Sequence, residues 1–227
     1  MEIGIIAEGK GDCAVLKNIL MGLLDLDEED IRFLRPDFNM DNTDKAAYES
    51  MPLSEFSTWT LVKKDCEEHN KFRSFLDNPI AGERYIIIQI DTAECEEKGY
   101  DIQRADKKNP DYCEQLRQAV KGKIDEWLQN KWADQIHYAI CIEEMEAWIH
   151  TLYEKRNTSI PVKAKEAFQK CLAKHLKTNK KLARQFQKNQ RTEFIKADFL
   201  SKKFRKKKEL MKALEQNQSL KTFVLSF

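Results

Sequence analysis

Acidic residues stand in three short clusters along this 227-residue chain, and each cluster follows an apolar run. The clusters are Glu8 with Asp12, Asp91 with Glu94 and Glu96, and Glu143 with Glu146. Carboxylates gathered in one place repel one another, and a bound cation relieves that repulsion. Carboxylate oxygens suit Mg²⁺ or Mn²⁺, and a metal held there can clamp a phosphodiester. The spacing therefore predicts a metal site, with solvated loop carboxylates or helix N-caps as the alternative.

The elements that must position these clusters follow from the hydrophobic pattern. Short apolar runs predict strands at 2–7, 31–34, 85–90 and 136–142. Helical spacing predicts helices after Asp12, which is the expected N-cap, and at 59–76, 111–130 and 143–153. Strands alternating with helices indicate an α/β fold with a mainly parallel sheet, in which ligands bind beyond the carboxyl ends of the strands. Residues 37–57 are polar and are expected to form a loop.

The helix expected after the last strand has two distinct faces. Met145, Trp148, Ile149 and Leu152 form an apolar stripe at helical spacing. Glu146 lies away from this stripe and is expected to face the cleft. His150 is expected to be a surface histidine rather than a metal ligand.

Basic residues concentrate near the end of the chain. Residues 155–212 hold 20 Lys+Arg against 4 Asp+Glu, a net of +16, whereas the other residues hold 19 against 34, a net of −15. The sequence therefore predicts an α/β domain at 1–155 and a basic helical extension at 156–227. Binding to a phosphate backbone would relieve the self-repulsion through counterion release. The residues expected to bind nucleic acid are Lys10, Lys202, Lys203, Arg205, Lys206, Lys207 and Lys208. A solvated helix face, or docking to an acidic partner or a second copy, is the alternative.

Other classes of protein fit the sequence less well. Six cysteines are scattered without a CxxC pair, which argues against a zinc ribbon or a disulfide scaffold and favours reduced thiols in a cytoplasmic protein. No apolar run approaches the roughly 20 residues that span a bilayer, and no secretory leader is recognisable. The motifs GxxxxGK[ST], GxGxxG and GxSxG are also absent. Cys13, at a helix start, is expected to be a buried structural thiol.

Three segments, taken together and in this order, resemble the Toprim nuclease family over residues 1–155. They are the strand end IIAEGKGD with Glu8 and Asp12, the strand end IQIDTAE with Asp91, and the segment Glu146–Ile149, which is similar to a signature of an uncharacterised bacterial branch found near phage-defence genes. The resemblance implies a Toprim-like sheet flanked by helices. It also implies Glu8 as general acid/base or ligand, Asp12 and Asp91 as metal ligands, and Glu146 as a further ligand or its support.

One position departs from the family pattern, because Ala93 stands where a second Asp is expected. Glu94 or Glu96 could replace the missing carboxylate; otherwise the chain is an inactive variant, natural or engineered. The expected function is a Mg²⁺- or Mn²⁺-dependent endonuclease of DNA or RNA that serves antiviral defence, with Glu8 and Asp91 as catalytic residues. The alternative is a non-catalytic nucleic-acid-binding or regulatory subunit of a defence complex. Expected partners are nucleic acid, an ATPase or sensor subunit and a second copy of the chain, with no membrane.

Overall fold

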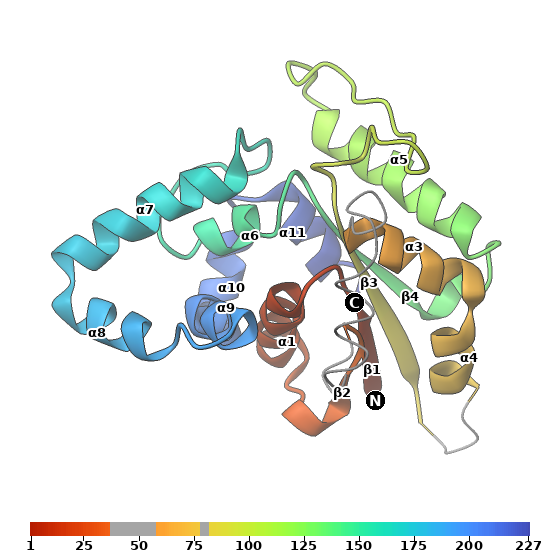
Figure 1. Cartoon of the computed structure of the whole chain (residues 1–227), viewed down its shortest axis with the longest axis horizontal. Helices are drawn as coiled ribbons and strands as arrows, with labels where there is room; N and C mark the ends of the chain where they lie inside the picture. Colours follow the sequence, from red (N-terminus) through yellow and green to blue (C-terminus); the bar gives the residue numbers. More distant parts are fainter. Residues whose placement is uncertain (37–57, 78–81) are drawn as a thin grey trace, which may run out of the picture.

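A four-stranded parallel sheet forms the centre of the protein (Figure 1). The computed structural model describes residues 1–36, 58–77 and 82–227, so the predicted loop at 37–57 lies outside the described residues. The strands are β1 (Glu2–Ile6), β2 (Ile31–Arg35), β3 (Arg84–Asp91) and β4 (Ile136–Cys141), in the order β2-β1-β3-β4. All four predicted strands and the parallel α/β architecture are thus confirmed. Since β1 pairs with both β2 and β3, the strand order reverses there, and the carboxyl ends of β1 and β3 flank a crevice.

The two faces of the sheet contribute to two separate hydrophobic cores, because alternate residues of a strand point to opposite sides. Ile87 of β3 packs with Ile3 and Ile5 in one core, whereas its neighbours Ile86 and Ile88 pack in the other. Both faces are covered by helices. This explains why the strands are continuous apolar runs rather than alternating ones.

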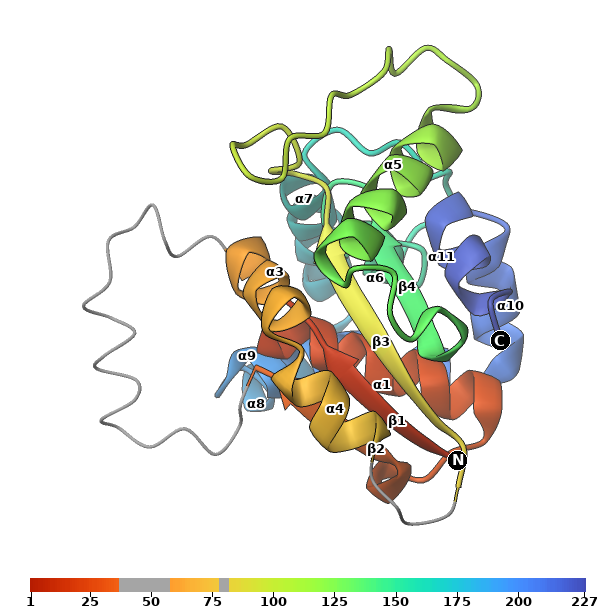
Figure 2. The same ribbon diagram turned by 90° about the vertical axis from the view of Figure 1, so that its right-hand side faces the viewer.

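Three helices cover one face of the sheet (Figure 2): α3 (Thr58–Glu68), α4 (Asn70–Leu76) and α5 (Tyr112–Trp127). The single helix predicted at 59–76 is two helices, because His69 between them adopts a left-handed backbone conformation with φ of 62°. A residue in that conformation cannot continue a right-handed helix.

The opposite face carries α1 (Lys10–Leu24) and the helices that end the chain. These are α6 (Glu146–His150), α7 (Ala164–Thr178), α8 (Lys180–Lys188), α9 (Glu193–Ser201), α10 (Lys207–Leu214) and α11 (Gln218–Val224). Short 3₁₀ segments lie at Glu28–Asp30, Ala133–Gln135 and Lys202–Arg205. Helix α6 is shorter than the helix predicted at 143–153. Within the described residues, no helix has the length and apolar character needed to cross a lipid bilayer.

The C-terminal helices share the core of the α/β body. Phe204 and Phe223 are fully buried in the same cluster as Ile5. A Cβ added to Gly22 of α1 would lie 2.0 Å from the carbonyl oxygen of Phe204, so only glycine permits this approach of the two backbones. Residues on both sides of the predicted boundary at 155 therefore belong to one core. Helices α7 and α8 reach furthest from the sheet (Figure 1).

Candidate metal centre

A cleft of about 540 Å³ lies beyond the carboxyl ends of β1 and β3. The acidic residues that line it are Glu8, Asp12, Asp91, Glu94, Glu144 and Glu193. Lys10 and Lys165 line it as well. The sheet thus brings together Glu8, Asp12 and Asp91, which the sequence distributes over more than eighty positions.

Glu8 and Asp91 are joined directly at the crevice. The backbone N–H of Asp91 donates to Oε1 of Glu8 at 2.7 Å. Gln89, fully buried in β3, accepts from the backbone N–H of Glu8 at 3.0 Å and donates from Nε2 to Oδ1 of Asp91 at 2.8 Å. The hydroxyl of Tyr100 donates to the backbone carbonyl of Asp91 at 3.2 Å. These bonds orient the carboxylates of Glu8 and Asp91, both of which line the cleft.

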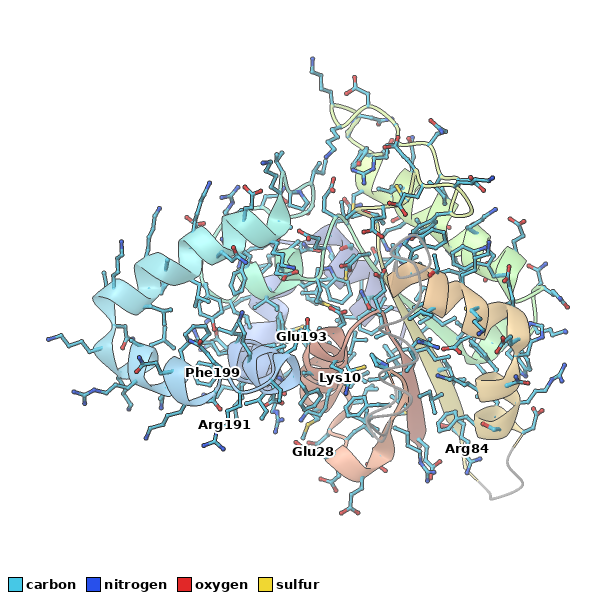
Figure 3. All side chains as sticks on the ribbon, viewed as in Figure 1. Lys10, Glu28, Arg84, Arg191, Glu193 and Phe199 are labelled. Carbon is cyan, nitrogen blue, oxygen red and sulfur yellow. The ribbon has the colours of Figure 1, made fainter. Side chains whose placement is uncertain are left out.

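Asp12 occupies the first turn of α1. Gly9 is the N-cap of this helix, so the prediction that Asp12 caps it is wrong by three residues. The N-terminal end of a helix favours a negative charge, which helps Asp12 to sit beside other carboxylates. A Cβ on Gly11 would lie 3.3 Å from Cγ of Glu193, so the absence of a side chain there lets α9 bring Glu193 up to the cleft. Figure 3 shows Glu193 and Lys10 near this end of α1.

The carboxylates at this edge perturb one another. Burial, followed by the charges of Glu8, Glu146 and Glu193, raises the pKa of Asp12. Burial and the charges of Glu8, Asp12 and Glu146 likewise raise the pKa of Asp91. Like charges held together in this way mark a site that favours a proton or a cation.

Glu146 lies next to this cleft, in a smaller pocket that Asp12 and Glu193 also line. It begins α6, and burial is the main cause of its raised pKa. The apolar stripe predicted for this helix is confirmed in that Met145, Trp148 and Ile149 are buried. His150 is only 3% exposed, so the expectation of a surface histidine is wrong.

The other acidic residues of the predicted clusters have basic or aromatic partners. Glu143 accepts from Arg104 at 2.9 Å and from Lys107 at 2.7 Å. Glu96 pairs with Arg104 at 3.7 Å, and its neighbour Glu97, which belongs to none of the predicted clusters, accepts from the indole N–H of Trp59. Of the two residues expected to compensate for the missing aspartate, only Glu94 lines the cleft.

The side chain of Arg104 binds the loop that carries Ala93. The guanidinium of Arg104 donates to the backbone carbonyls of Thr92 and Ala93, both at 2.6 Å, while its Nη1 binds Glu143. The backbone N–H groups of Thr92 and Ala93 donate to the carbonyl of Glu143 at 3.1 and 3.0 Å. Ala93 itself lines the cleft without offering a side-chain oxygen.

The predicted basic residues lie in two places. Lys10 is at the cleft, whereas the run from Lys202 to Lys208 begins in the segment that packs on Gly22 of α1. Eleven residues of α-helix separate Gly11 from Gly22, about 16 Å along the axis. Within the run, Arg205 binds Asn18, Glu28 and Asp198, and Lys203 lies over the ring of Tyr153. The others are exposed, namely Lys202, Lys206, Lys207 and Lys208.

Four residues of the site were missed by the sequence analysis, namely Gln89, Glu144, Lys165 and Glu193. Lys165 had no signal, because it is one of many lysines in the basic segment. Gln89 had a signal, since it is the one polar residue inside the apolar run YIIIQI. The signal for Glu144 was weak, because it consisted only of the position of this residue between Glu143 and Glu146 in the sequence. Glu193 follows β4 by more than fifty residues and had no signal, because only the packing of α9 on α1 places it at the cleft.

The cysteines contribute no nucleophile to this cleft. All six lie within the described residues, and all are buried and free of disulfides. Cys13 donates to the carbonyl of Arg35, and burial together with the charge of Asp12 raises its pKa. The prediction of a buried structural thiol is therefore confirmed.

Comparison with known proteins identifies no relative. No family model, no curated protein and no solved structure matches the chain.

Proposed function

We propose that the cleft binds Mg²⁺ or Mn²⁺ and hydrolyses phosphodiester bonds of DNA or RNA, as the resemblance to Toprim nucleases implies. The observation that carries this proposal is the convergence of Glu8, Asp12 and Asp91 on one cleft, with the pKa of both aspartates raised. The acidic residues of the cleft offer carboxylate oxygens, which bind hard divalent cations such as Mg²⁺ in preference to soft metal ions. Asp12 and Asp91 would hold the metal, with Glu146 or Glu94 completing the set.

The residues that line the cleft would have different roles in phosphodiester hydrolysis. When bound, the metal would supply charge neutralisation at the phosphate and a more acidic water. Glu8, which accepts the backbone N–H of Asp91, would take a proton from the attacking water. Lys10 and Lys165 would draw a phosphate backbone to an otherwise acidic cleft. An antiviral role, in a complex with an ATPase or sensor subunit, is part of this proposal only through the family resemblance.

The test is cleavage by the natural chain and by an Ala93→Asp variant. Both are incubated with single- and double-stranded DNA and RNA in Mg²⁺ or Mn²⁺, with an Asp12→Asn, Asp91→Asn double variant as the control. We expect metal-dependent cleavage that the double variant lacks and that Ala93→Asp increases. If neither the natural chain nor the Ala93→Asp variant cleaves any of these substrates, alone or in the presence of a cell extract, the proposal is overturned.

The second candidate is a nucleic-acid-binding subunit without catalysis. Ala93 favours it, because this side chain lines the cleft at the position where the resemblance implies a ligand. Two results together would support it: binding of nucleic acid that falls steeply with salt, and no detectable Mn²⁺ binding in either form.

A further inference from the structure

A second set of potential ligands lies outside the acidic cleft. One ligand atom each from His150, Glu154 and Cys171 lies within 4.8 Å of the others. His150 belongs to α6, Glu154 follows it by one turn, and Cys171 comes from α7. His150 and Cys171 are 3% and 8% exposed, whereas Glu154 is exposed.

The side chains already face one another. Nε2 of His150 lies 3.1 Å from Oε2 of Glu154. Among the described residues, Sγ of Cys171 has no hydrogen-bond partner. Burial lowers the pKa of His150, which favours the neutral form of the imidazole that binds metals. A thiol, a neutral imidazole and a carboxylate together are the donors typical of a transition-metal site rather than a magnesium site.

The charge of such a site balances. A divalent ion bound by one thiolate, one carboxylate and one neutral imidazole carries no net charge. That matters here, because Lys163, Lys170 and Lys174 line the adjoining pocket of about 300 Å³ and would repel a centre with excess positive charge. Arg156 lies 3.7 Å from Glu154 and competes for its carboxylate when no metal is bound.

We propose that His150, Glu154 and Cys171 form a three-ligand site for Zn²⁺ or a similar transition-metal ion, with water from the adjoining pocket in the fourth position. Ligand atoms around tetrahedral zinc lie about 3.3–3.8 Å apart. The separation of 3.1 Å between His150 and Glu154 is already close to this range, and a separation at the upper limit of 4.8 Å needs to contract by only about 1 Å on binding. The site would clamp α6 to α7. Both helices serve the acidic cleft, since α6 carries Glu146 and α7 carries Lys165 near its start.

The probe is Co²⁺ added to the reduced, metal-free full-length chain. A cobalt ion bound by thiolate absorbs in the near ultraviolet, a signature that carboxylate ligands in the acidic cleft cannot produce. We expect one equivalent of Co²⁺ to give this band and one equivalent of Zn²⁺ to displace it. The Asp12→Asn, Asp91→Asn variant should keep the band, which separates this site from the proposed nuclease centre.

The variants decide which side chains bind. Cys171→Ser should abolish the near-ultraviolet band, and Glu154→Gln should keep it but weaken Co²⁺ binding at least about tenfold. Glu166→Gln, an exposed change in the same pocket, is the matched control and should bind as the natural chain does. No band in the natural chain, or a band retained in Cys171→Ser, would overturn the proposal. If Cys171→Ser fails to fold, unchanged Co²⁺ affinity in Glu154→Gln overturns it instead.

Discussion

The carboxylate of Glu8 accepts the backbone N–H of Asp91 at 2.7 Å, so a residue two positions after β1 binds the last residue of β3. This bond holds Glu8 at the cleft beside Asp12 and Asp91. If Glu8 is the base of the proposed reaction, several measurable consequences follow from its position and from its neighbours.

Glu8→Gln should remove the proton acceptor while keeping an oxygen for the N–H of Asp91. We expect cleavage to fall at least about 100-fold, the scale for loss of a general base, with little change in the thermal unfolding midpoint. The measurement is the cleavage rate at saturating Mn²⁺. Glu29→Gln, an exposed change near the other end of α1, is the control and should cleave normally. Equal rates in the two variants would show that Glu8 has no chemical role.

Gln89→Leu should weaken metal binding without touching a predicted ligand. The amide of Gln89 orients both Glu8 and Asp91, and loss of a residue that orients metal ligands typically costs about 10–100-fold in affinity. Isothermal titration with Mn²⁺ measures the change. Gln118→Leu, on the exposed face of α5, is the matched control. Unaltered Mn²⁺ affinity in Gln89→Leu would mean that this network does not position the site.

The metal-free chain should lose stability from the acidic cleft as pH rises. The pKa values of Asp12 and Asp91 are raised in the folded state, which therefore binds more protons than the unfolded chain. Their contribution to the unfolding free energy is fully present below about pH 4, the ordinary pKa of aspartate, and is lost as pH rises through the raised values.

The comparison that isolates this effect is with the Asp12→Asn, Asp91→Asn variant. In EDTA, the variant should become increasingly more stable than the natural chain as pH increases, and saturating Mg²⁺ should close the gap by stabilising only the natural chain. Unfolding midpoints across the pH range provide the measurement. A gap that stays constant with pH would contradict the predicted repulsion.

Arg104→Met should loosen the loop at Thr92 and Ala93. The guanidinium of Arg104 binds both carbonyls and Glu143, and its removal takes this donor from the partly buried carbonyl of Thr92, at a cost of about 1–3 kcal/mol. Urea denaturation measures the loss, and hydrogen exchange at residues 92–97 should locate it. Lys107→Met also removes a partner of Glu143 but from a side chain 42% exposed, so it should cost under about 1 kcal/mol. Equal losses in the two variants would count against the special role of Arg104.

Lys165→Gln and Lys206→Gln should separate the two basic regions. Lys165 lines the cleft, whereas Lys206 follows the segment packed near the far end of α1. We expect Lys165→Gln to reduce the salt slope of nucleic-acid binding by about one and to slow cleavage of short oligonucleotides. Lys206→Gln should leave cleavage of the short substrate unchanged. The reverse pattern would place the substrate on the C-terminal run instead.

The sequence by itself determined the local elements and their order. Apolar runs such as YIIIQI predicted each of the four strands found in the described residues, and the alternation of strands with helices predicted a parallel sheet, because hydrophobic periodicity reflects which faces of each segment are buried. It also predicted that carboxylates at strand ends would meet, since the ends of parallel strands lie on one edge.

The tertiary structure decided which carboxylates face the cleft and which are neutralised elsewhere. Glu143 forms ion pairs with Arg104 and Lys107, whereas Glu193 lines the cleft although its helix, α9, does not directly follow a strand. It also placed the basic C-terminal helices on the core rather than beyond it, and brought Cys171 to His150 across two helices. Such pairings depend on contacts between segments that are distant in the chain. Hydrophobic periodicity shows which face of a segment is buried, but it does not show which other segment packs against that face.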